Sequence, residues 1–217
     1  MTALFIGVYG ASGFGKEVMP LVRQQYPALA KERFVFIDDG QSGSALNSYP
    51  VLSYDQFLSN PAQHKAVTIA IANSQVREKL AARLTQDNIQ HLAIQAPNTV
   101  ILDEVEIGEG SLLCPFTCRT SNIKIGKFFH ANIYSYIAHD CVIGDYVTFA
   151  PGVKCNGNIH IQDHAYIGTG AVIKQGTPDK PLVIGKGAII GMGAVVTKSV
   201  PAGVTVVGNP ARILEKK

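Results

Sequence analysis

Charge is scarce in this 217-residue sequence. Charged residues make up 16% of the chain, and the net charge at neutral pH is only +3. The 19 basic residues are scattered, so neither a nucleic-acid-binding stripe nor a polybasic membrane anchor is indicated. Hydrophobic residues make up 47%, which is enough for a sizeable core and too much for a disordered chain. The composition therefore predicts one or two globular domains.

Long apolar runs and closely paired cysteines are missing as well. No run approaches the roughly 18 apolar residues of a membrane-spanning helix, and the N-terminus lacks the basic segment of a signal peptide. The few cysteines do not make a disulfide scaffold, and no Cys-x-x-Cys pair suggests structural zinc; they are Cys114, Cys118, Cys141 and Cys155. We expect a soluble cytoplasmic protein with reduced thiols and no metal.

Glycine is unevenly distributed and divides the chain. Six of the 21 glycines lie before Pro97 and fifteen lie after it, and the hydrophobic periodicity changes at the same place. The sequence therefore predicts two domains, residues 1–96 and residues 97–217.

The first domain alternates short apolar runs with helical patterns. Strand–helix alternation of this kind favours a small Rossmann-like parallel sheet with helices on its faces. The predicted strands are Leu4–Tyr9, Arg33–Asp38, Lys65–Ala72 and Ile89–Ile94, and the predicted helices are Gly13–Gln25 and Ser74–Gln86, the latter with Val76, Leu80 and Leu84 on one stripe.

The second domain repeats an apolar residue every six positions. From Ile101 to Ile173, twelve of the thirteen positions spaced by six are apolar, and Arg119 is the exception. This period fits neither an α-helix nor a flat strand, but it fits a chain that turns a corner every six residues. Three such faces close a triangular coil, and stacked coils share one core. The frame resumes at Ile184 after five extra residues, so Gln175–Leu182 is expected to loop out of one corner.

The hexapeptide array resembles the left-handed β-helix acyltransferases. The tail Val207–Arg212 is similar to the segment that closes the coenzyme A site in many of them, and the turn Gly10–Lys16 narrows the resemblance to one subgroup. That subgroup contains bacterial N-acetyltransferases of nucleotide-linked amino sugars and sialic-acid O-acetyltransferases. The resemblance implies a nucleotide-sugar-binding domain followed by a left-handed parallel β-helix. It also implies acetyl-CoA as co-substrate and a homotrimer with active sites between neighbouring β-helices.

The resemblance also implies a catalytic histidine, His139, followed by an acid that is Asp140 here and often Glu in relatives. A neutral imidazole with a pKa of about 6.5 can accept a proton as an amine attacks a thioester. A carboxylate partner fixes the tautomer, although adjacent strand residues point apart, so this contact needs a backbone bend. Asn132 matches a position that contacts the substrate's amine in members of the family. Gly157 matches one whose N–H faces the oxyanion, and an ordinary corner glycine is its alternative.

A glycine-rich turn follows the first strand and opens the first helix. Backbone N–H groups in such a turn can reach a phosphate, and acids at the end of the second strand can bind a ribose or base. In the subgroup the acid pair contacts the uracil of a UDP-sugar, and a solvated turn is its alternative. The residues expected to bind the nucleotide sugar are Gly10, Ala11, Ser12, Gly13, Asp38, Asp39 and Asn73.

Coenzyme A is expected in the groove between two β-helices, where small residues permit a close approach and a cation can meet its phosphates. The candidates are Thr169, Gly191, Met192 and Arg212, and an ordinary coil corner is the alternative for each. Cys141 and Cys155 fall in repeat columns and are interpreted as small core residues rather than nucleophiles.

Three functions outside this family are weaker alternatives. A zinc enzyme of the γ-carbonic-anhydrase kind needs three converging histidines; His139, His160 and His164 are available, but their spacing does not match. A nicotinamide dehydrogenase is suggested by the glycine turn, which however reads Gly-x-x-Gly-x-Gly in a domain that is short for a dinucleotide. A non-catalytic nucleotide-sugar-binding protein would have the same pocket and no turnover.

The expected reaction is acetylation of the C4 amine of a UDP- or dTDP-linked 4-amino-4,6-dideoxy sugar for a bacterial surface glycan. O-acetylation of sialic acid is the alternative within the family. The nucleotide pocket favours the first.

Overall fold

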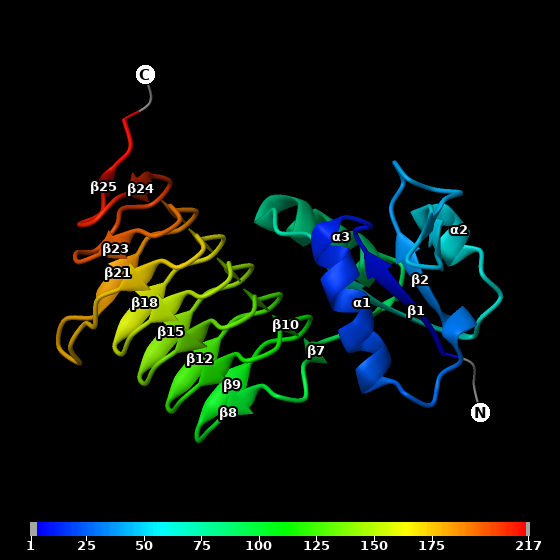
Figure 1. Ribbon diagram of the computed structural model, residues 1–217, viewed down its shortest axis with the longest axis horizontal. Helices are drawn as coiled ribbons and strands as arrows, with labels where there is room; N and C mark the ends of the chain where they lie inside the picture. The colour runs from blue at the N-terminus through cyan, green and yellow to red at the C-terminus, as the bar shows by residue number, and fades with distance from the viewer. Residues whose placement is uncertain (1–3, 216–217) are drawn as a thin grey trace. The chain divides into compact units, whose positions relative to one another are not determined.

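The computed structural model describes residues 4–215 (Figure 1). The chain forms two compact units that divide between Ile94 and Gln95, two residues before the boundary expected from the sequence. The first unit mixes helices and strands, and the second is built from short strands.

The first unit is a mainly parallel sheet with helices in its connections. The strand order is β3-β4-β2-β1-β5-β6, so the first strand lies in the middle and pairs in parallel with β2 and β5. Only β3 runs antiparallel, against β4. The elements are β1 (Leu4–Tyr9), α1 (Gly13–Gln25), the 3-10 helix η1 (Lys31–Arg33), β2 (Phe34–Ile37), β3 (Ala45–Leu46), β4 (Tyr49–Leu52), α2 (Tyr54–Leu58), β5 (His64–Ile69), α3 (Ser74–Gln86) and β6 (Gln90–His91). This confirms the predicted Rossmann-like sheet.

Two details of the first unit differ from the sequence prediction. The buried stripe of α3 consists of Arg77, Ala81 and Leu84, whereas Val76 is 41% exposed. The polar Arg77 belongs inside because its guanidinium donates to the carbonyl oxygens of Ile71 and Ala72, at 2.7 and 3.2 Å.

The predicted last strand, Ile89–Ile94, is also split in two. Only β6 joins the sheet of the first unit, whereas β7 (Ile94–Gln95) already belongs to a sheet of the second unit. The chain leaves the first sheet just after Leu92, whose N–H still donates to the carbonyl oxygen of Val67 at 2.9 Å.

The second unit is a three-sided prism of parallel strands, drawn in green to red in Figure 1. Paired residues are 18 positions apart, as in His130 with Thr148 and Ile137 with Cys155, so each coil contains three six-residue faces. The hexapeptide period is therefore confirmed as a parallel β-helix. The eight-stranded sheet contains β7, β10 (Leu112–Leu113), β13 (His130–Ala131), β16 (Thr148–Phe149), β19 (Tyr166–Ile167), β22 (Ile189–Ile190), β24 (Thr205–Val207) and the antiparallel β25 (Arg212–Ile213).

The other two faces complete each coil. The six-stranded sheet contains β8 (Val100–Ile101), β11 (Cys118–Arg119), β14 (Tyr136–Ile137), β17 (Lys154–Cys155), β20 (Val172–Ile173) and β23 (Val195–Val196), and the five-stranded sheet contains β9 (Val105–Ile107), β12 (Ile123–Ile125), β15 (Cys141–Ile143), β18 (Ile159–Ile161) and β21 (Leu182–Ile184). The expected loop lies between β20 and β21, where Thr177 and Lys180 exchange backbone hydrogen bonds across a tight turn.

Arg119 occupies an inward position that is apolar in the other coils. It is 1% exposed, its Nη1 donates to Thr117 Oγ1 at 2.6 Å, and its guanidinium carbon lies 5.8 Å from the ring centre of Phe129. Burial lowers the pKa of Arg119 to about 10, so the side chain stays protonated at neutral pH. The six-residue frame thus decides the direction of this side chain, despite its charge.

The helices of this fold are short. Among residues 4–215, none is long and apolar enough to cross a lipid bilayer.

Candidate active site

His139 and Asp140 lie at the corner that joins the six-stranded sheet to the five-stranded sheet, between β14 and β15. His139 Nδ1 is 2.7 Å from Asp140 Oδ2, and both side chains are about half exposed, at 47% and 46%. The bend that this contact requires is present, because Asp140 has a φ of 59°. The carboxylate favours a proton on Nδ1, which leaves the lone pair of Nε2 as the free acceptor.

Asn122 holds the acid from the preceding coil. Its Nδ2 donates to Asp140 Oδ1 at 3.2 Å, so both carboxylate oxygens are engaged. The hydrogen bond with His139, followed by that with Asn122, lowers the pKa of Asp140. Asn122 was not predicted from the sequence, although its distance of 18 residues from Asp140 places both at the same corner position of successive coils.

Gly157 lies beneath the imidazole of His139. A β-carbon on Gly157 would stand 2.5 Å from His139 Cε1 and 2.6 Å from Nε2. The ring therefore rests on this residue's backbone. The lack of a side chain on Gly157 is thus required by its neighbour His139.

A second corner carries Asn132 and three of the coenzyme A candidates. These residues follow β13, β19 and β22, at the junction of the eight-stranded and six-stranded sheets. Thr169 and Met192 are exposed, the latter at 81%, and Gly191 lies against Val207 Cγ1, which would be 2.7 Å from a β-carbon. Asn132 Oδ1 accepts from the N–H of Ile133 at 2.7 Å. The whole width of the six-stranded sheet separates this corner from His139, so one chain does not bring the two sets together.

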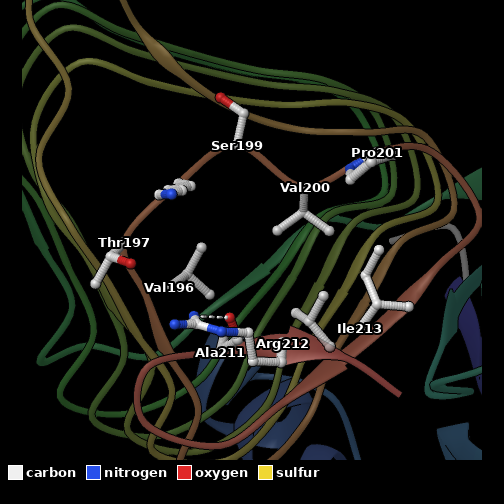
Figure 2. Close-up of a pocket in the computed structure, with 10 residues that line it drawn as sticks. Val196, Thr197, Ser199, Val200, Pro201, Ala211, Arg212 and Ile213 are labelled. Atoms are coloured by element: carbon white, nitrogen blue, oxygen red, sulfur yellow. Dashed lines mark hydrogen bonds between the residues drawn. The ribbon is translucent and has the colours of Figure 1, made fainter. Parts of the chain in front are cut away.

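Arg212 lies at a pocket of about 280 Å³ beside the last coils (Figure 2). Its Nη1 donates to the carbonyl oxygen of Ala211 at 2.9 Å. Lys198 also lines this pocket and supplies a second cation. It lies at the same corner of the prism as His139, three coils later. The residues that line the pocket are Val196, Thr197, Lys198, Ser199, Val200, Pro201, Val206, Ala211, Arg212 and Ile213.

In the first unit, Asp38 organises the glycine turn. Its Oδ2 accepts from the N–H of Ala11 at 3.2 Å and from Gln41 Nε2 at 3.0 Å, and Gln41 Nε2 also reaches the carbonyl oxygen of Ala11 at 3.2 Å. Gly10 has a φ of 111°, and a β-carbon there would stand 2.9 Å from the carbonyl oxygen of Ala70. The turn is thus held by a carboxylate and by close backbone packing. Gln41 gave no signal in the sequence because its role depends on the loop after β2.

The start of α1 is open to an anion. Its first turn contains no acidic residue, and the exposed Ser12 makes no side-chain cap. Apart from its two chain neighbours and the backbone of α1 itself, no atom of the described residues lies within 4 Å of a β-carbon built on Gly13. The backbone N–H groups at a helix N-terminus favour an anionic group such as a phosphate.

Asp39 and Asn73 are engaged by their own chain. Asp39 Oδ1 accepts from the N–H of Tyr54 at 2.8 Å, and Oδ2 accepts from the Tyr9 hydroxyl at 3.5 Å. Burial, followed by the charge of Asp39, raises the pKa of Tyr9 to about 12. Asn73 caps α3, its Oδ1 accepting from the N–H groups of Gln75 and Val76 at 3.1 Å. Asp39 follows β2 as predicted, whereas β5 already ends at Ile69, before the predicted Ala72, and Asn73 lies four residues further on as the N-cap of α3. These oxygens already serve the fold.

The cysteines Cys141 and Cys155 are buried in the prism. The Cys141 thiol donates to the carbonyl oxygen of Asn156 at 3.2 Å. Their burial agrees with the interpretation as core residues.

Two of the three histidines of the zinc alternative have different neighbours. His164 stacks on Tyr146, with ring centres 5.3 Å apart, whereas His139 lies against Gly157. Within residues 4–215, no group of three or more His, Cys, Asp or Glu side chains is arranged to hold a metal ion.

Both units match known protein families. The family model described as "PglD N-terminal domain" matches residues 6–84, and the one described as "Bacterial transferase hexapeptide (six repeats)" matches residues 122–157. GDP-perosamine N-acetyltransferase from Escherichia coli O157:H7 is 51% identical over 212 residues, which are 97% of this chain and 96% of that protein.

Solved structures agree over the full length. WeeI from Acinetobacter baumannii AYE is 84% identical with a TM-score of 0.97, and the match covers 97% of this chain and all of that one. The acetyltransferase domain of PglB from Neisseria gonorrhoeae FA1090, in complex with acetyl coenzyme A, is 27% identical with a TM-score of 0.84; that match covers 99% of this chain and all of that one.

Proposed function

Because this chain belongs to the hexapeptide-repeat N-acetyltransferases of nucleotide-linked amino sugars, for which acetyl-CoA is the donor, we propose that its acceptor is the C4 amine of a UDP- or dTDP-linked 4-amino-4,6-dideoxy sugar. The product would enter a bacterial surface glycan. The observation that carries the chemical proposal is the half-exposed His139, paired with Asp140 and held over Gly157.

In the proposed reaction His139 is the general base. The amine nitrogen attacks the thioester carbonyl carbon, and Nε2 of His139 takes the proton that this nitrogen releases. The tetrahedral intermediate then expels the thiolate of coenzyme A, the C–S bond breaks, and the imidazolium returns its proton to the sulfur. The pairing of Nδ1 with Asp140 stabilises the charge that His139 acquires. The N–H of Gly157 and the side chain of Asn132 are proposed to contact the oxyanion and the amine.

We propose a homotrimer, because the two corners of one prism face away from each other. His139 and the corner of Asn132 and Thr169 are separated by the six-stranded sheet, so a complete site needs one corner from each of two chains. Arg212, Gly191 and Met192 would then bind coenzyme A beside the other chain's histidine.

Mixed oligomers test this arrangement. His139→Ala removes the base, and Thr169→Trp places a large side chain at the corner proposed to bind coenzyme A. Each variant alone should therefore be inactive. When the two are co-expressed, heterotrimers should regain part of the activity, since some sites combine two intact corners. Mixed oligomers without activity, or an active monomer, would contradict the shared site.

The proposed nucleotide-binding residues are those of the glycine turn, with Asp38, Asp39 and Asn73. Asp38 holds the turn, and the N–H groups at the start of α1 would meet the diphosphate. A second candidate nucleotide is GDP, which is supported by the relative named GDP-perosamine N-acetyltransferase.

Thiol release from acetyl-CoA measures the reaction directly. The panel contains UDP-, dTDP- and GDP-linked 4-amino-4,6-dideoxy sugars and free sialic acid. We expect the UDP- or dTDP-linked sugar to give the highest kcat/KM, with an acetamido product by mass spectrometry. A preference for the GDP-linked sugar would replace UDP or dTDP by GDP as the nucleotide of the acceptor. Acetylation of sialic acid alone would overturn the proposal.

A further inference from the structure

The position of the His139 ring depends on the backbone at Gly157. The imidazole occupies the space directly above this α-carbon, so a small shift of the residue moves the ring. The ordinary ladder of the prism holds this segment through Asn158 N–H to His139 O and Gly176 N–H to Gly157 O, both at 3.0 Å.

Asn156, the residue before Gly157, adds side-chain hydrogen bonds to the backbone pairing between coils. Its Oδ1 accepts from the Tyr136 hydroxyl at 2.9 Å, and its Nδ2 donates to the carbonyl oxygen of Ile173 at 2.7 Å. Tyr136 lies on β14, three residues before His139, and Ile173 lies on β20. One amide side chain therefore links three successive coils at the level of the imidazole.

An amide satisfies both hydrogen bonds. One end must accept from a hydroxyl group and the other must donate to a carbonyl group. A carboxylate at this position would face the carbonyl oxygen of Ile173 with a second acceptor. The main-chain oxygen of Asn156 also accepts from the Cys141 thiol, next to Asp140 in sequence, at 3.2 Å.

We propose that Asn156, anchored by Tyr136, is a positioning residue for the reaction: it fixes the peptide on which the imidazole of His139 rests. This inference depends on the proposed role of His139 as the base. Asn156 acts through His139 and not on either substrate. Misplacing a catalytic group by about 1 Å can cost on the order of 100-fold in rate, and the expected losses are set by that scale.

The test is a double-mutant cycle with a UDP-linked 4-amino-4,6-dideoxy sugar and acetyl-CoA as the assay substrates, and the GDP-linked sugar if the panel favours it. Asn156→Ala and Asn156→Asp should lower kcat by about 10- to 100-fold with both KM values unchanged, and Tyr136→Phe should lower it less. In the His139→Ala background the same substitutions should change the residual rate less than twofold. Lys124→Ala, on the exposed face of the five-stranded sheet, is the matched control.

A spectroscopic readout makes the test independent of the substrate. The NMR signal of the Cε1 proton of His139 should shift in Asn156→Ala and, to a smaller extent, in Tyr136→Phe, whereas those of His160 and His164 should not. If Asn156→Ala does not fold, Tyr136→Phe still provides the measurement because it removes only a hydroxyl group.

The inference is wrong if Asn156→Ala leaves kcat unchanged, raises KM instead, or lowers the rate equally with and without His139. An unmoved His139 signal also overturns it. A His139→Ala variant with full turnover would overturn the base assignment, and the NMR shift would then decide the role of Asn156 separately.

Discussion

The imidazole of His139 takes the space that a side chain on Gly157 would need. The two residues are 18 positions apart, one full coil of the prism, and a β-carbon on Gly157 would lie 2.5 Å from His139 Cε1. The absence of a side chain at one coil is thus what leaves room for the histidine of the coil before it.

Gly157→Ala should displace this ring. The added methyl group cannot coexist with the imidazole in its present place, so kcat should fall by about 100-fold with a small change in melting temperature. Gly108→Ala is the contrasting control, because its methyl group would meet the backbone at Gly126 and Lys127, 2.6 Å away. That variant should lose thermal stability, and its folded fraction should keep its kcat. Steady-state kinetics and thermal melting of both variants separate the two effects, and an unchanged kcat in Gly157→Ala would contradict the contact.

Asp140→Asn should lower kcat by about 10- to 100-fold, because the imidazolium loses its charged partner while the hydrogen-bonding shape remains. Asn122→Ala should have a smaller effect, since one of the two hydrogen bonds on the carboxylate remains. Steady-state kinetics of both variants measure these losses.

The pKa of Asp140 lies below its ordinary value of about 3.9. Its contribution to stability is therefore present above about pH 4 and is lost as the pH falls through the lowered value. Acid unfolding of Asp140→Asn, followed by circular dichroism, should lack that component. An unchanged acid transition would show that the pair is not formed in solution.

Asp38→Ala should weaken binding of the nucleotide sugar alone. The substitution releases the N–H of Ala11 and the Gln41 side chain, which together hold the glycine turn. We expect the KM for the nucleotide sugar to rise about tenfold, and that for acetyl-CoA to stay constant, since the loss of a charged hydrogen bond costs about 1.5–3 kcal/mol. Asp55→Ala removes an exposed acid paired with Arg83 at 3.3 Å and serves as the control, because such surface pairs contribute little. Equal KM values for the two variants would exclude a role of Asp38 in this site.

Tyr9 should remain protonated well into the alkaline range. Burial and the nearby Asp39 raise its pKa to about 12 from an ordinary value of about 10. Since the folded chain holds this proton more tightly, the contribution to stability is complete below about pH 10 and is lost as the pH rises towards 12. In a spectrophotometric titration of tyrosinate, Tyr9→Phe should remove one group from the late phase and none from the phase near pH 10. Loss of a group from the early phase would contradict the burial.

The sequence predicts the architecture because core burial imposes the periods. Inward positions such as Ile137 and Ile161 must recur every six residues for the coils to stack, and the bounds of α1 and α3 agree with the predicted helices. Arg119 and Arg77 show where hydrophobicity fails as a guide. The former points inward because its place in the coil requires it, and the latter because its partners are backbone carbonyl groups.

The regular coil length also makes part of the candidate site predictable. His139, Asp140 and Gly157 come from the resemblance, and the 18-residue coil brings them together. The ties made by Asn122 and Asn156 depend on which side chains meet across coils, which a single sequence does not reveal unless the coil length is already known.

The turnover of His139→Ala, measured beside its binding affinities, tests the central claim most directly. We expect kcat to fall about 1000-fold while calorimetric dissociation constants for coenzyme A and the nucleotide sugar stay within twofold, because a general base contributes on the order of 100- to 10,000-fold and binds neither substrate tightly. His160→Ala is the control and should keep its turnover. His160 lies on β18, which pairs with the strand that follows His139, β15. A His139→Ala enzyme whose kcat stays within tenfold of the unaltered protein would contradict the account.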